Sequence, residues 1–160
     1  MIGARTKPGG VSMGRIDVLI VDDQAIVREG VKRILAEAPD VQIAGEAASG
    51  AEAIGLMRNA SWDVILLDMS RPDTDGIGIL RTIQDYDPRS LVLVLGLYAE
   101  DRVALRMLKA GARGYVEKQD APGELVPAIH RVAEGGHYIG SALADRLSRD
   151  LAAARPPWSR

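Results

Sequence analysis

The chain has 160 residues, of which 47% are hydrophobic and 26% charged, a composition typical of one globular domain. Its formal net charge of -2 gives no reason to expect nucleic-acid binding by the chain itself, and the absence of cysteine excludes disulfides, cysteine-zinc sites and thiol catalysis. We expect a cytoplasmic protein that does not enter a membrane, because no apolar run approaches the ~18 residues that cross a bilayer and the first residues lack the apolar core of a signal peptide.

Short aliphatic runs alternate along the chain with segments whose apolar residues have helical spacing. The predicted strands are residues 16–21, 41–47, 63–68, 91–96 and 114–117. The predicted helices are residues 26–35, 50–59, 77–87, 100–110 and 125–133. This alternation predicts an α/β fold with a doubly wound, five-stranded parallel sheet and helices on both of its faces.

The two ends of the chain differ from this regular middle part. Residues 1–15 are rich in glycine and are predicted to form a flexible N-terminal tail before a domain at 16–139. Residues 140–160 are predicted to hold an extra C-terminal helix, with Ser141 as its cap, and a proline-containing linker. One face of that helix carries Leu143, Leu147 and Leu151. This stripe either docks on the domain or contacts another subunit.

Charged side chains gather at the carboxyl ends of the predicted strands, which meet at one edge of a parallel sheet. Asp22 and Asp23 end the first strand, Asp68 ends the third, and Lys118 follows the fifth. Clustered carboxylates repel one another, and Mg²⁺ is a hard cation that stabilises them, while a lysine suits phosphoryl oxygens. The set predicts phosphoryl transfer onto an ionised aspartate. Asp22 and Asp23 have a simpler alternative as helix caps.

These motifs, in this order and spacing, resemble the receiver domain of two-component response regulators. The motifs are Asp22-Asp23, Asp68 with Pro72 and Asp75-Gly76, and the segment from Gly114 to Lys118. Two further segments, Val21 to Gly30 and Gly135 to Tyr138, are similar to LuxR-type (NarL/FixJ-like) transcriptional regulators. The resemblance covers residues 16–139.

The resemblance implies a role for each residue at the sheet edge. Asp68 is the implied phosphoacceptor, Lys118 the phosphoryl-binding residue and Tyr115 the switch aromatic. The implied Mg²⁺ ligands are Asp22, Asp23, Asp68 and the backbone carbonyl of Ser70. The implied sheet order is 2-1-3-4-5.

The resemblance also implies partners. They are a sensor histidine kinase, a helix-turn-helix output domain in a longer parent protein, and a second copy in a homodimer. The chain is then not an enzyme, beyond Mg²⁺-dependent self-phosphorylation and autodephosphorylation at Asp68.

One position departs from the family pattern. Receivers normally carry Thr or Ser at the end of the fourth strand, where this chain has Gly96. That hydroxyl ordinarily donates to the phosphoryl group and moves toward it, which leaves room for the switch aromatic. A donor to a charged acceptor is worth roughly 1.5 to 3 kcal/mol. We therefore expect Asp68 to be phosphorylated but to be coupled to Tyr115 more weakly than in an ordinary receiver.

Two alternatives remain beside a phosphorylated receiver. A degenerate receiver would signal through a fixed protein surface without phosphate, and Gly96 favours it, as does Arg71 at a position where the family usually has an apolar residue. A phosphohydrolase of the haloacid-dehalogenase type is disfavoured, because it needs an acid/base aspartate two residues after the nucleophile, where this chain has Ser70.

Overall fold

Residues 14–69, 76–97 and 101–153 are described by a computed structural model of the chain. They form a six-stranded parallel sheet in the order β2-β1-β3-β4-β5-β6. The strands are β1 (Ile16–Val21), β2 (Val41–Ala47), β3 (Val64–Met69), β4 (Val92–Gly96), β5 (Gly114–Glu117) and β6 (Tyr138–Ile139). The helices are α1 (Ala25–Leu35), α2 (Gly50–Asn59), α3 (Gly76–Tyr86), α4 (Asp101–Lys109), the 3-10 helix η1 (Lys118–Asp120), α5 (Ala121–Ala133) and α6 (Ser141–Ala153). The doubly wound α/β architecture is thereby confirmed.

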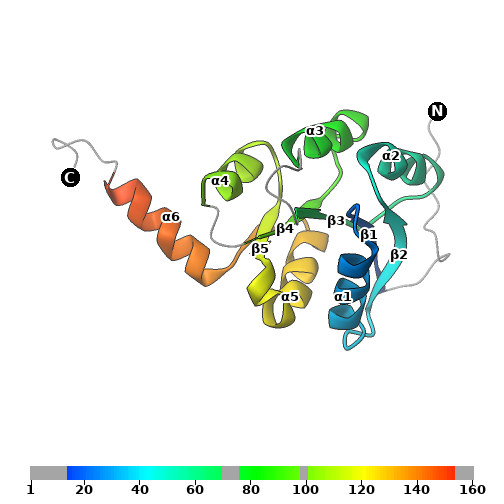
Figure 1. The fold of residues 1–160 in the computed structure, drawn as a ribbon, viewed down its shortest axis with the longest axis horizontal. Coiled ribbons are helices and arrows are strands. Elements are labelled where there is room, and N and C mark those ends of the chain that lie inside the picture. The colour runs from blue at the N-terminus through cyan, green and yellow to red at the C-terminus, as the bar shows by residue number, and fades with distance from the viewer. Residues whose placement is uncertain (1–13, 70–75, 98–100, 154–160) are drawn as a thin grey trace.

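The sheet separates two layers of helices. Figure 1 shows α1 and α5 on one face and α2, α3 and α4 on the other. None of the helices in the described ranges is both long and apolar enough to span a membrane.

The prediction of five strands was wrong by one strand. β6 pairs with β5 in parallel, with Tyr138 opposite Gly114. Gly135 has a φ of 87°, in the left-handed region that favours glycine, and it reverses the chain after α5. A Cβ at Gly114 would lie 2.7 Å from the Tyr138 carbonyl oxygen, so glycine permits the close pairing. A strand of only two residues has no alternation that the sequence can reveal.

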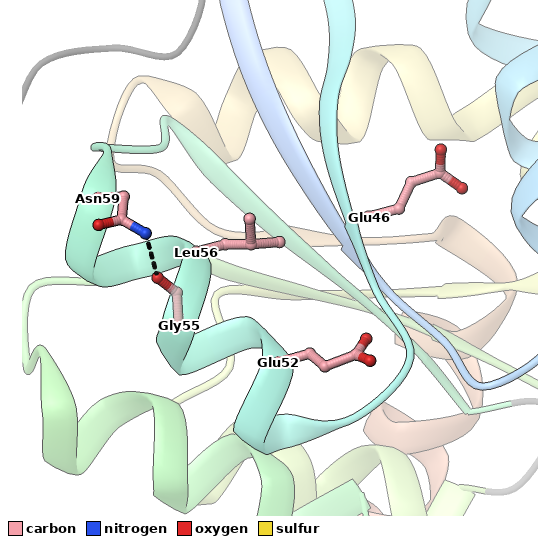
Figure 2. A pocket seen from close by; sticks show the side chains of 5 residues that line it. All are labelled: Glu46, Glu52, Gly55, Leu56 and Asn59. Atoms are coloured by element: carbon pink, nitrogen blue, oxygen red, sulfur yellow. Dashed lines mark hydrogen bonds between the residues drawn. The ribbon is translucent and has the colours of Figure 1, made fainter.

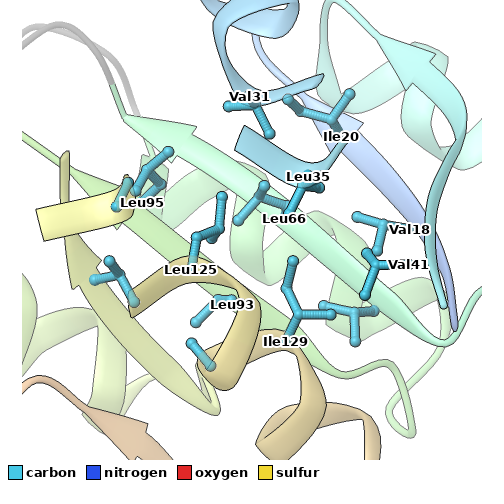
Figure 3. Packing of buried hydrophobic residues seen from close by; sticks show 14 of the residues in the cluster. Val18, Ile20, Val31, Leu35, Val41, Leu66, Leu93, Leu95, Leu125 and Ile129 are labelled. Atoms are coloured by element: carbon cyan, nitrogen blue, oxygen red, sulfur yellow. The ribbon is translucent and has the colours of Figure 1, made fainter. Parts of the chain in front are cut away.

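Two apolar cores cover the two faces of the sheet. Figure 3 shows the core beneath α1 and α5, in which side chains of the central strands meet those of the two helices. Its labelled members include Val18, Ile20, Leu66, Leu93, Leu95, Leu125 and Ile129. Alternate residues of the same strands, among them Leu19, Leu67 and Val94, belong to the second core under α2, α3 and α4. The central strands are apolar on both faces, as in other parallel sheets.

The predicted start of the second helix is also found in the structure. Ser49 is the N-cap of α2, and its Oγ accepts a hydrogen bond from the backbone N–H of Glu52 at 3.2 Å. The Glu52 carboxylate reaches back to accept from the N–H of Ala48 at 2.6 Å. These bonds satisfy donors that a helix end otherwise leaves without partners.

The predicted C-terminal helix is confirmed as α6, although Ser141 is its first residue rather than its cap. Leu143 is buried and Leu147 partly buried in the second core, whereas Leu151 is exposed. Arg146 adds polar contacts, because its Nε donates to Asp101 Oδ1 of α4 at 3.0 Å and its Nη2 pairs with Glu117 at the end of β5. The first two leucines of the stripe therefore dock on the domain, and Arg146 joins the helix to α4 and to the end of β5.

Candidate functional site

Asp68 and Lys118 meet at the carboxyl edge of the sheet. The Nζ of Lys118 lies 3.1 Å from Asp68 Oδ1. The Asp68 side chain has 0% exposure, while that of Lys118 is 26% exposed. Asp68 lies near the carboxyl end of β3, and Lys118 is the first residue of η1, directly after β5. The buried carboxylate therefore has a cation beside it that water can still reach.

A pocket of about 290 Å³ opens next to this pair, and it contains both remaining predicted carboxylates. It is lined by Val21, Asp22, Asp23, Ala48, Ser49, Gly50, Leu67, Asp68 and Ile79. Asp22 is buried and Asp23 is exposed. The structure thus brings the residues at the ends of β1 and β3 to one cavity.

Asp22 also shapes the turn that leads from β1 into α1. Its Oδ1 accepts a hydrogen bond from the Gln24 N–H at 2.9 Å, and its backbone carbonyl accepts from Arg28 Nη1 at 2.6 Å. The N-cap of α1 is Gln24, so neither aspartate is a helix cap in the strict sense. Asp22 therefore stabilises the turn before α1, whether or not it also binds a ligand.

The donor atoms around the pocket suit a magnesium ion. They are carboxylate oxygens, and Mg²⁺ typically binds one or two carboxylates and completes its octahedron with water and phosphate oxygens. Within the described ranges, no three His, Cys, Asp or Glu side chains form a cluster able to hold a metal by themselves. Mg²⁺ usually keeps several of its waters, so a few carboxylate oxygens are compatible with it. Ser70 and Arg71, the predicted carbonyl ligand and the unusual neighbour, lie outside the described residues.

Tyr115 occupies the space beside Gly96. Gly96 lies on the α3 and α4 face of β4, the face on which Tyr115 is 1% exposed in the second core. A Cβ built on Gly96 would lie 1.8 Å from Tyr115 Oη and 2.2 Å from its Cζ. No larger residue at position 96 is compatible with this position of the ring.

The sequence alone indicated that a hydroxyl is missing at position 96, but it did not indicate what fills the space. A signal was available, because glycine inside a buried strand often marks the close approach of another group.

A second pocket, between β2 and α2, lacks the chemistry of the first. Figure 2 shows its lining residues, which are Glu46, Glu52, Gly55, Leu56 and Asn59. Asn59 Nδ2 donates to the Gly55 carbonyl at 3.1 Å within the helix. Glu46 is already paired with Lys32 Nζ at 2.6 Å and with Arg28 Nε at 3.0 Å, and none of the predicted site residues lines this pocket.

Comparisons with known proteins identify relatives of this chain. The family described as "Response regulator receiver domain" matches residues 18–130. Response regulator UvrY of Escherichia coli (strain K12) is 36% identical over 133 residues, which are 83% of this chain and 61% of UvrY. Nitrate/nitrite response regulator protein NarL of the same strain is 32% identical over 143 residues, which are 89% of this chain and 66% of NarL. The chain thus spans less than two thirds of either relative.

A solved structure has a similar fold. The crystal structure of a LuxR-family two-component response regulator from Aurantimonas sp. SI85-9A1 aligns with a TM-score of 0.79 at 31% identity. The alignment covers 86% of this chain and 99% of that one.

Proposed function

This chain belongs to the response regulator receiver domain family and is of the LuxR type, and from that premise we propose that Asp68 accepts a phosphoryl group. The observation that supports this proposal is the 3.1 Å contact between Lys118 Nζ and the buried Asp68, beside a pocket lined by Asp22 and Asp23. A nucleophile, a cation and further carboxylates are the groups that acyl-phosphate formation at an aspartate requires.

The reaction follows from the roles of these side chains. An oxygen of the ionised Asp68 carboxylate attacks the phosphorus of the donor, a new oxygen-phosphorus bond forms, and the bond from phosphorus to the donor breaks. No general base is needed, because the nucleophile carries no proton. Lys118 holds an oxygen of the incoming group by charge. Asp22, Asp23 and Asp68, with the Ser70 carbonyl, would hold Mg²⁺, which neutralises charge on the phosphoryl oxygens when it is bound.

The partners follow from the same proposal. A sensor histidine kinase donates the phosphoryl group in the cytoplasm, and residues 16–139 form the receiver unit. Residues 140–160 connect it to a helix-turn-helix domain in a longer parent protein. That output domain binds DNA, and the receiver itself does not. The receiver pairs with a second copy as a homodimer, and it has no catalytic activity beyond its own phosphorylation and dephosphorylation.

Replacement of Asp68 by asparagine is expected to abolish phosphorylation. The chain is incubated with Mg²⁺ and a small acyl-phosphate donor, and its intact mass is measured. The original chain should gain one phosphoryl group, Asp68→Asn none, and a sample treated with a chelator of Mg²⁺ almost none. Asp85→Asn is the matched control, because Asp85 is an exposed carboxylate on α3, and it should behave like the original chain.

A second candidate function is favoured by the position of Tyr115. Its ring already lies in the core in the chain without phosphate, next to Gly96. A degenerate receiver that signals through a fixed protein surface needs no further movement of this residue. Absence of phosphate on the original chain in the mass measurement would select this alternative.

A further inference from the structure

We propose that the hydroxyl of Tyr115 replaces the side-chain hydroxyl that is missing at Gly96 and donates a hydrogen bond to the phosphoryl group on Asp68. This inference rests on the proposed function, because it concerns the same acceptor. It gives Tyr115 a direct contact with the transferred group, in addition to its place in the core.

The first argument is the position of the phenol oxygen. Tyr115 Oη lies 1.8 Å from the point at which the Cβ of a larger residue 96 would stand. The oxygen of serine or threonine is bonded directly to Cβ. Tyr115 therefore places its hydroxyl where the side chain of a serine or threonine at position 96 would stand.

The second argument is the place of residue 96 in the sheet. Gly96 pairs with Met69, the residue after Asp68, and with Glu117, the residue before Lys118. Position 96 thus lies between the two strand ends that carry the acceptor and its lysine. The backbone of Tyr115 pairs with Val94, but its ring lies beside Gly96, two residues further along β4. The side chain therefore extends toward the carboxyl ends of the strands.

The third argument concerns what the hydroxyl adds. Phenylalanine has the same ring without the oxygen, so only the hydroxyl of Tyr115 can donate to a ligand. Hydrogen bonds to charged oxygens are the stronger kind. A phosphoryl group on Asp68 offers such oxygens at the sheet edge. Since the donor is in place before the group arrives, no movement of Tyr115 into the core is required.

The inference is tested by replacing Tyr115 with phenylalanine, which removes the hydroxyl and keeps the ring. Beryllofluoride with Mg²⁺ serves as the probe for a bound phosphoryl group, and its affinity is measured by ¹⁹F NMR. Loss of one hydrogen bond to a charged group should weaken the affinity about tenfold to a hundredfold. The lifetime of the phosphoryl group on Asp68, followed by intact mass, reports on the same contact.

Tyr138→Phe is the matched control. The Tyr138 hydroxyl donates to Glu124 Oε1 at 3.0 Å, and the residue lies on the neighbouring strand β6. Its replacement should leave the affinity for beryllofluoride unchanged. Thermal unfolding of both variants shows whether either has lost its fold.

A rescue experiment separates contact with the ligand from packing. Tyr115→Ala opens the space beside Gly96, and the added change Gly96→Thr returns a hydroxyl from the other strand. The double variant should bind beryllofluoride more tightly than Tyr115→Ala alone. Equal affinity of the original chain and Tyr115→Phe, or no gain in the double variant, would overturn the inference. If the original chain binds no beryllofluoride and gains no phosphate, the proposed function itself fails, and this inference fails with it.

Discussion

Replacement of Gly96 by threonine is expected to destabilise the folded chain and to expel Tyr115 from the core. The new Cβ would lie 1.8 Å from Tyr115 Oη and 2.2 Å from Cζ, which no small side-chain shift can relieve. Overpacking typically costs 1 to 3 kcal/mol, and exposing a buried aromatic ring adds a loss of similar size. We expect the free energy of unfolding to fall by about 2 to 4 kcal/mol. Urea unfolding measures the loss, and NMR of Tyr115 reports the new environment of its ring.

A pair of alanine substitutions provides the control for this prediction. Gly96→Ala should destabilise the chain, because even a single methyl group meets the Tyr115 ring. Gly30→Ala should stabilise it by about 1 kcal/mol, because Gly30 lies in α1 with nothing within 4 Å of an added Cβ, and alanine favours a helix. A Gly96→Thr chain as stable as the original, with Tyr115 unmoved, would contradict the position found for the ring.

Replacement of Arg146 by alanine is expected to release α6 from the domain. Hydrogen bonds to Glu117 and Asp101 raise the pKa of the Arg146 guanidinium, and Glu117 is only 3% exposed. Without Arg146 that buried carboxylate loses the cation that compensates its charge. Breaking a fully buried ion pair costs 3 to 5 kcal/mol, and because the Arg146 side chain is 26% exposed we expect about 1 to 3 kcal/mol. Hydrogen exchange of the amides in residues 141–153 should become faster.

Arg149 offers a matched control on the same helix. Its Nε donates at 3.5 Å to the Asp145 carbonyl of α6, and it is exposed. Arg149→Ala should leave the exchange of α6 unchanged. Arg146→Lys should give an intermediate rate, because lysine keeps the charge but lacks the planar fork that reaches two carboxylates. Slow exchange in Arg146→Ala equal to that of the original chain would show that the leucines alone hold the helix.

Much of the fold could be predicted because its elements depend on local patterns. Aliphatic runs such as residues 64–67 are buried in the central strands, and the order of the first five strands is as the family resemblance implied. The sixth strand escaped prediction because two residues show no periodicity, and its pairing depends on the absence of a side chain at Gly114.

The part of the candidate site that could be predicted is the set of residues at the carboxyl ends of the strands. In a parallel sheet these ends meet at one edge, and the structure places Lys118 against Asp68 there. The roles of these residues stay predictions. The contacts that escaped prediction join distant parts of the chain: Tyr115 to Gly96, and Arg146 to both Asp101 and Glu117. Such contacts depend on packing between elements, which the sequence pattern does not reveal.

The close packing of the Tyr115 ring against Gly96 also restricts which substitutions this sequence can accept during evolution. A step from Gly96 to threonine meets the ring, whereas a step from Tyr115 to a small residue leaves a cavity of the kind that costs 3 to 5 kcal/mol in aromatic to alanine substitutions. Each single step lowers stability as long as an aromatic ring at position 115 stays in the core. The two positions are therefore epistatic, because the residue at position 96 decides whether the ring at position 115 can remain in the core.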